Sequence, residues 1–383
     1  MNKGTFTGKN NCLWIIDGII ISLICVLSGS LFFNFIVGKF SSDFVAHIST
    51  VISGNKGYSL AHLIIKICSL SGHTNEVLTI VMVVIIACTI GASYIYVYGR
   101  LNSILDSSVI LFVAISSIFV NSLYVPVVFP YFYTHYTVVS QPWHNITYLV
   151  MRLWSIGVLC LWFEILNDIQ MSKKLRARYL LLFLVLLIMC NWSKPNFVLA
   201  FAPMVAFVFI HVLLVSHGKS IRSVLLVSLM GILSMVPVFF QTRVVFDESE
   251  KASIVISAEN FVDYLFGNVQ GNFLIYEFCN LLFPMFVLIT LLYLHFGKKN
   301  NIDFSRITCA FLMFVISHLQ QLFLAEDGPR KLDGNFAWGV YGMGMLLYLI
   351  IITEWIYIYK TKNINKIVYM VGNVIYCWHV FGG

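Results

Sequence analysis

Long apolar stretches alternate with short polar loops along almost the whole chain. About ten of them approach or reach the roughly 20 residues that a helix needs to cross a bilayer. The predicted spans cover residues 13–36, 77–98, 108–129, 146–166, 179–196, 197–216, 224–242, 272–296, 307–324 and 337–359. A shorter apolar tail, Ile367–Val380, could cross the membrane, re-enter it or lie on its surface. The pattern predicts an all-α polytopic membrane protein with about 10–11 transmembrane helices, forming a single domain over residues 1–383.

The loops between these stretches fall into two sets that alternate along the chain. One set is short and basic, and it comprises Met171–Arg178, His217–Ser223, Gly297–Arg306 and Lys360–Lys366. The other set is longer and rich in His, Asp, Glu, Trp, Tyr and Pro, and it comprises Lys39–His73, Pro130–Thr147, Arg243–Asp263 and Leu324–Gly339. The residues that look chemical are therefore expected on one side of a membrane and the topology anchors on the other.

Composition excludes a soluble protein. Hydrophobic residues make up 59% of the chain and charged residues only 11%, against about 25% charged in ordinary soluble domains. The net charge of +7 does not indicate a nucleic-acid partner, because Lys and Arg lie at helix ends rather than on one face. Nine scattered Cys residues show no zinc-like spacing and no disulfide framework, so the cysteines predict no zinc site, and whether a divalent cation is needed stays open.

The distribution of basic residues predicts the orientation. With the N-terminus in the cytoplasm, fifteen Lys and Arg residues fall on the cytoplasmic side and eight on the other. This bias obeys the positive-inside rule. The stretch Leu13–Phe35 is too long for the core of a signal peptide and is interpreted as a retained first span. We therefore expect a multi-pass protein of the cell membrane with its active face outside the cytoplasm.

The first outer loop, over residues 39–75, is predicted to contain two short helices on the membrane surface. Asp43 and His47 are spaced i,i+4, so a helix places them on one face. Gly54–Tyr58 interrupts that helix, and a second apolar-polar run follows over Ser59–Leu70, with His62 near its start. A carboxylate next to an imidazole can act as a general base, bind a metal or orient a ligand. The same pair is also expected on a solvated amphipathic helix.

Two candidates lie around the start of the fourth predicted span. His144, in the segment Gln141–Thr147 (QPWHNIT), could contact an anionic or sugar ligand, although the segment also suits an interfacial anchor. Arg152 lies within the apolar stretch, where a cation should face a cavity or a partner. Its planar fork suits phosphate, whereas snorkelling to the interface is the alternative interpretation.

Two further outer segments carry candidate binding groups. Lys194 lies beside Pro195 at a helix break and could hold a lipid phosphate, or simply belong to a charged turn. The polar outer loop over residues 324–339 is rich in turn formers, and its candidate binding residues are Glu326, Asp327, Arg330, Asp333 and Asn335. These side chains could bind sugar hydroxyls, a pyrophosphate or a divalent cation, or form a solvated hairpin. Glu277 and His318 are further polar residues inside predicted spans.

This layout resembles the GT-C superfamily of membrane glycosyltransferases. The resemblance rests on many spans, a cytoplasmic N-terminus and a first outer loop of surface helices with an acidic residue soon after the first span. Ser42-Asp43-Phe44 occupies that position, and Gly57–Leu63 (GYSLAHL) is similar to the stretch entering the second surface helix of bacterial relatives. The resemblance extends over the architecture of about the first 220 residues.

The resemblance implies a function and roles for the candidate residues. GT-C enzymes move a sugar from a polyprenyl phosphate to a glycan, lipid or protein acceptor outside the cytoplasm. Asp43 would be the general base or orient the acceptor hydroxyl, and Arg152 and Lys194 would neutralise the departing lipid phosphate. The remaining candidates would shape the sugar pocket, namely His47, His62, His144, Glu326, Arg330, Asp333 and Asn335.

Two other classes fit parts of the same pattern. A polysaccharide polymerase or ligase of the O-antigen type also has ten or more spans and outer loops with Arg and His, usually concentrated in one very long loop. A transporter or flippase is expected to place polar groups at the bilayer midplane on broken helices, often in related halves. The chain shows no internal repeat and few midplane charges. The glycosyltransferase is therefore the preferred hypothesis.

Overall fold

The computed structural model describes most of the chain, and all structural statements below concern these residues. They are residues 11–40, 42–54, 57–121, 123, 145–245, 253–257, 259, 273–297, 301–327, 335–362 and 364–382. Apart from one short pair of strands, the regular structure among them is helical. The predicted all-α fold of a polytopic membrane protein is confirmed.

Eight helical segments are long and apolar enough to cross a membrane in the part of the chain that the structure describes. They are α1 (Asn11–Ile36), α4 (Thr74–Leu101), α6 (Ile146–Gln170), α8 (Asn196–Val215), α9 (Ile221–Leu233) with α10 (Val236–Val245), α12 (Phe273–Leu292) with the π-helical turn η1 (Tyr293–Gly297), α13 (Ser305–Phe323) and α14 (Ala337–Lys362). Each exceeds or approaches the thickness of the hydrocarbon core at 1.5 Å per residue.

The remaining elements are shorter. They are α2 (Phe44–Ile52), α3 (Leu60–Ser69), α5 (Ser107–Phe119), α7 (Ala177–Ser193), α15 (Lys366–Phe381), β1 (Ile254–Ile256) and β2 (Leu324–Glu326). The tail whose form was open in the sequence is thus a helix, α15. The two strands pair antiparallel, with Ile254 opposite Glu326.

Two predicted spans differ in detail from the structure. The stretch expected over residues 108–129 forms a helix only as far as Phe119, and most of the residues that follow lie outside the described ranges. The stretch expected over residues 224–242 divides into α9 and α10 at Ser234 and Met235. Pro237 accounts for that division, because proline lacks the N–H of an internal helical hydrogen bond but is tolerated in a first turn.

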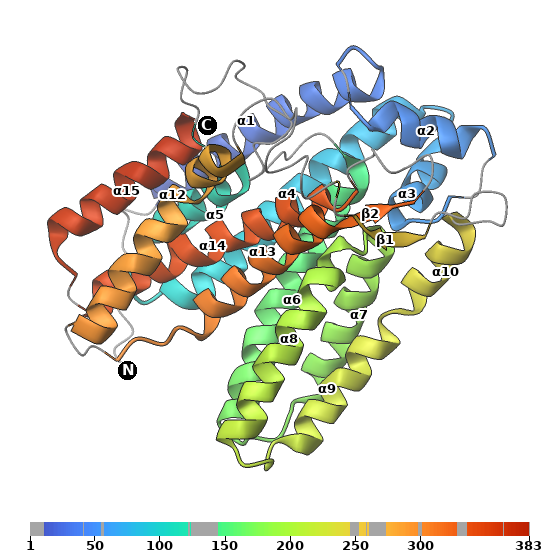
Figure 1. Cartoon of the computed structure of the whole chain (residues 1–383). Helices are drawn as coiled ribbons and strands as arrows, with labels where there is room; N and C mark the ends of the chain where they lie inside the picture. The colour runs from blue at the N-terminus through green and yellow to red at the C-terminus, as the bar shows by residue number, and fades with distance from the viewer. Residues whose placement is uncertain are drawn as a thin grey trace.

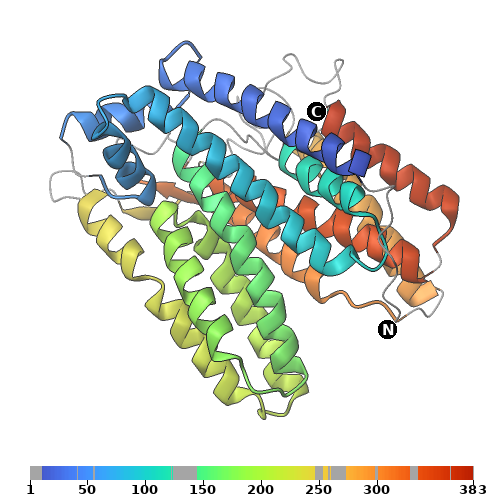
Figure 2. The same cartoon turned by 180° about the vertical axis from the view of Figure 1, so that it is seen from behind.

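The helix α14 forms the centre of the bundle. Every residue from Trp338 to Ile356 is buried, and α4, α5, α6, α8, α12 and α13 pack around it. Figure 1 and Figure 2 show α14 inside the bundle, while α6, α7, α8 and α9 extend together away from the other helices. The apolar character of α14 therefore serves packing against protein, whereas α1 and α9 expose large apolar side chains along their length.

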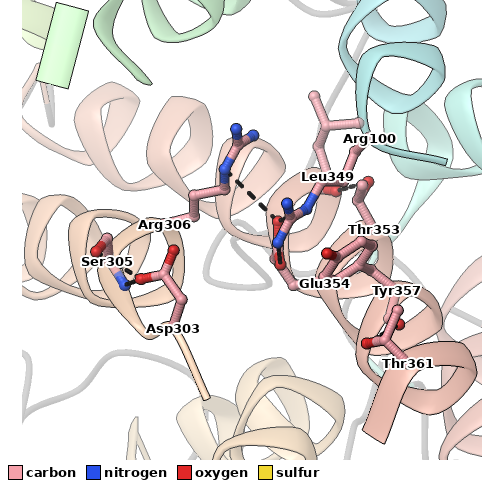
Figure 3. A network of polar contacts seen from close by, with 9 residues as sticks. All are labelled: Arg100, Asp303, Ser305, Arg306, Leu349, Thr353, Glu354, Tyr357 and Thr361. Carbon is pink, nitrogen blue, oxygen red and sulfur yellow. Dashed lines mark hydrogen bonds and ion pairs between the residues drawn. The ribbon is translucent and has the colours of Figure 1, made fainter. Parts of the chain in front are cut away.

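A buried ion cluster joins α14 to two of its neighbours (Figure 3). The Glu354 carboxylate is 1% exposed and accepts two hydrogen bonds from Arg100, at 2.9 and 2.8 Å. Arg306 of α13 lies 3.7 Å from the same carboxylate, and the Arg100 guanidinium stacks 3.5 Å from the centre of the Tyr357 ring. Glu354 is sixteen residues from Trp338, or about 24 Å along the helix axis.

Candidate functional site

A cavity of about 490 Å³ lies at the other end of α14. Segments that are far apart in the sequence line it, namely the start of α2, the segment that leads into α3, the start of α6, the turn between α7 and α8, α10, the end of β2 and the start of α14. Five of the predicted site residues meet there, and these are Asp43, His47, Lys194, Glu326 and Asn335. The fold therefore concentrates candidates from three separate loops around one space.

Four helices begin at this cavity. Asp43, Asn145 and Pro195 are the N-cap residues of α2, α6 and α8, and Trp338 is the second residue of α14; all four line the space. Helix N-termini present unpaired N–H groups and the positive ends of helix dipoles. Their convergence makes the cavity favourable for an anionic ligand.

The Asp43 side chain is held by the start of α6 instead of capping its own helix. Its Oδ2 accepts a hydrogen bond of 2.6 Å from Asn145 Nδ2. Asn145 is 3% exposed, and its Oδ1 accepts from the Tyr148 N–H at 3.0 Å and from the Thr147 hydroxyl at 2.6 Å. Asn145 thus caps α6 and orients Asp43 at the same time.

His47 and His62 form a hydrogen-bonded pair between α2 and α3. His47 Nδ1 lies 3.0 Å from His62 Nε2. The backbone N–H of Ser59 points at His62 Nδ1 over 3.3 Å, and because it can only donate, that nitrogen must accept. Neutral His62 therefore carries its proton on Nε2 and donates it to His47 Nδ1. This leaves the proton of neutral His47 on Nε2, away from the pair.

Both histidines resist protonation. Burial lowers the pKa of His47 from 6.5 to about 4, assisted by the nearby His62 and Lys194, while Asp43 acts in the opposite direction. Burial also lowers the pKa of His62 to about 4. His62 does not line the cavity; it supports His47 from behind. At neutral pH the pair therefore offers the cavity a neutral N–H donor.

We expect the thermal stability of the protein to fall as the pH is lowered from about 6.5 to about 4. The unfolded chain binds protons at these histidines in this range before the folded chain does, so acid favours unfolding. Each histidine contributes up to about a tenfold change in the folding equilibrium per pH unit. Thermal unfolding in detergent across this range checks the slope, and His47→Gln should make it shallower. An unchanged slope in that variant would contradict the assignment.

Lys194 occupies the break between α7 and α8. It has an extended backbone, with φ −160° and ψ 123°, and the following Pro195 is the N-cap of α8. Its Nζ donates to the Thr147 hydroxyl over 3.3 Å and lies 4.9 Å from the centre of the Trp338 ring. The ring face attracts the ammonium group and keeps it at the cavity.

Glu326 and Asn335 form the side of the cavity next to α14. Asn335 Nδ2 donates to Glu326 Oε2 over 3.1 Å, and Asn196 Nδ2 donates to the Asn335 carbonyl over 2.9 Å. The strand β2 is therefore connected to the start of α8. The predicted partners Arg330 and Asp333 lie outside the described residues, as does His144.

Arg152 does not reach the cavity. It is 1% exposed, its Nε lies 2.9 Å from Met345 Sδ, and its Nη2 donates to the Ile118 carbonyl over 3.2 Å. Its guanidinium lies 5.4 Å from the centre of the Tyr148 ring. The structure thus places this cation near the carboxyl end of α5, in contact with residues that do not line the cavity.

Several lining residues had no functional interpretation from the sequence. They are Ala46, Tyr58, Asn145, Thr147, Ser193, Pro195, Asn196, Val238, Gln241, Thr242 and Trp338. An asparagine directly before an apolar run is a helix-start signal, so Asn145 could have been recognised as a cap, although not as a partner of Asp43. In the described ranges no three His, Cys, Asp or Glu side chains are grouped to hold a metal ion.

The side chains in this cavity combine complementary kinds of chemistry. A carboxylate can take or orient the proton of a hydroxyl group, an ammonium group and four helix N-termini suit a phosphate, and amides with a Trp face suit a polyhydroxylated ring. No protein-family model, curated protein or solved structure matches this chain.

Proposed function

We propose that this protein is a membrane glycosyltransferase of the GT-C type. It moves a sugar from a polyprenyl-phosphate-linked donor to a glycan, lipid or protein acceptor at the extracytoplasmic face of the cell membrane. The observation that carries the proposal is the cavity in which Asp43 and Lys194 meet at the N-termini of α2, α6, α8 and α14. The sidedness rests on the distribution of basic residues in the sequence.

The roles follow from the contacts of each side chain. Asp43, oriented by Asn145, takes or orients the proton of the acceptor hydroxyl. Lys194 and the surrounding helix N-termini stabilise the charge that develops on the departing lipid phosphate. Neutral His47, Glu326 and Asn335 provide donors and acceptors for sugar hydroxyls. Arg152 is buried and does not line the cavity, so it takes no part in holding the lipid phosphate.

The position of the cavity favours an enzyme over a transporter. A transporter binds its cargo near the bilayer midplane on interrupted helices. Here the candidate groups lie at helix ends, on short segments such as α2 and β2. This placement suits a reaction between a membrane-anchored donor and an acceptor at the surface.

The test is transfer of radiolabelled sugar from a panel of polyprenyl-phosphate-linked donors in membranes that contain the protein. We expect one donor to support transfer and Lys194→Met to reduce it by about 10²–10³-fold, because the variant keeps the apolar stem but lacks the charge. Lys66→Met is the matched control, since Lys66 is an exposed lysine of α3 that does not line the cavity. Absence of transfer with every donor, or equal activity of the two variants, would contradict the proposal.

A further inference from the structure

Two ionisable side chains face each other between α12 and α13, away from the cavity residues. Glu277 Oε2 and His318 Nε2 lie 3.0 Å apart, and the two side chains are only 14% and 12% exposed. Both atoms are fully buried, and neither accepts or donates a hydrogen bond in the part of the chain that the structure describes, so their contact at this distance is electrostatic. Such a pair inside apolar helices is costly unless its charges and protons balance.

A hydrogen bond shows that the other ring nitrogen of His318, Nδ1, carries a hydrogen. His318 Nδ1 lies 3.2 Å from the backbone carbonyl of Phe314, one turn earlier in α13. A carbonyl oxygen only accepts, so Nδ1 must carry a hydrogen. In a neutral imidazole, Nε2 is then an acceptor, and it faces an oxygen of Glu277 that is also an acceptor when ionised.

We infer that Glu277 and His318 form a binding site for one proton within the membrane domain. With no proton, two acceptors would meet at 3.0 Å and the buried carboxylate would lack a compensating charge. One bound proton removes both costs, either as imidazolium with carboxylate or as imidazole with carboxylic acid. Both forms have zero net charge, which suits burial. This inference does not rest on the proposed transferase activity.

The site is connected to a second buried histidine. Asn280 Nδ2 donates to Glu277 Oε1 over 3.2 Å, and the Tyr348 hydroxyl donates to the Asn280 carbonyl over 2.5 Å. The same hydroxyl lies 3.1 Å from His379 Nδ1 on α15. The polar chain therefore joins α12, α14 and α15 to the proton site.

Tyr348 and His379 are the titratable groups that α14 and α15 direct toward the pair. The helix α8, which also packs on α13, carries no titratable side chain over residues 196–210. The strand β2, which continues α13, carries Glu326, whose carboxylate accepts from Asn335. The bound proton is thus held chiefly by the two side chains themselves.

Spectroscopy on the full-length protein in liposomes at pH 8 tests the site. We expect either a doubly protonated His318 ring in ¹⁵N-histidine NMR, or a neutral ring with a carboxylic acid C=O band in the infrared that disappears in Glu277→Gln. Both results place one proton on the pair. A neutral ring without such a band would overturn the inference.

The Glu277→Gln variant also provides a test that is independent of spectral assignment. A glutamine N–H can donate to neutral His318 Nε2, so the variant should fold without the bound proton. In the wild type the folded state then binds one proton more than the unfolded state at high pH. Its folding equilibrium should therefore weaken by about tenfold per pH unit as the pH rises above neutral, relative to Glu277→Gln. Parallel pH profiles for the two proteins would contradict a bound proton.

Discussion

Replacing Asp43 by Asn is expected to reduce sugar transfer by about 10²–10⁴-fold while the protein remains folded and inserted. The amide cannot accept the proton of the acceptor hydroxyl, so the loss falls on the chemical step. An Asn side chain at this position still offers an oxygen to Asn145 Nδ2, so the contact between α2 and α6 can persist. Transfer from a polyprenyl-phosphate-linked donor, measured in membranes beside the wild type, gives the result.

Asp106→Asn is the matched control for this variant. Asp106 is also an N-cap residue whose side chain makes no capping hydrogen bond, but it begins α5 and does not line the cavity. The control should retain wild-type transfer. Equal transfer by Asp43→Asn and the wild type would remove Asp43 from the mechanism, even if the protein proves to be a glycosyltransferase.

Replacing Glu354 by Ala is expected to destabilise the protein by about 3 kcal/mol. Removing one partner of a buried ion pair costs about 3–5 kcal/mol, because the remaining charge lacks compensation. Arg100 and Arg306 keep 22% and 25% of their side-chain surface exposed, so partial hydration should hold the cost near the lower limit. The unfolding midpoint in detergent should fall clearly.

The chain offers a matched control for this prediction as well. Glu164 pairs with Arg176 at 3.0 Å, but its side chain is 50% exposed. Exposed pairs contribute about 0–1 kcal/mol, so Glu164→Ala should shift the midpoint little. Similar shifts for Glu164→Ala and Glu354→Ala would show that the buried cluster does not carry the expected energy.

Hydropathy was sufficient to predict the fold class. Each unpaired backbone N–H or C=O group is costly in lipid, and a helix pairs these groups within itself. Hydropathy was less informative about helix ends and breaks. The stretch 224–242 is uniformly apolar, so its division at Ser234 and Met235 required attention to Pro237. Likewise, no apolar periodicity distinguishes α14, which is enclosed by protein, from a helix that faces lipid.

The candidate site was predictable only in part. Asp43, Lys194 and Glu326 were selected because ionisable residues are conspicuous in polar loops between spans, and the structure brings them to one cavity. Asn145 was missed as a partner because a contact between residues 102 positions apart leaves no local pattern. Arg152 was selected by its charge alone, whereas its place in the fold depends on packing by Met345.

The enclosed position of α14 has a consequence for biogenesis. Six of the described helices that pack against it, α4, α5, α6, α8, α12 and α13, precede it in the chain and are therefore synthesised first, and only α15 follows. They cannot complete their packing until α14 leaves the ribosome and enters the space between them. During that interval the polar residues destined to contact α14, above all Arg100, lack their partner. We therefore expect the nascent bundle to stay open until α14 arrives, after which α15 can pack against it.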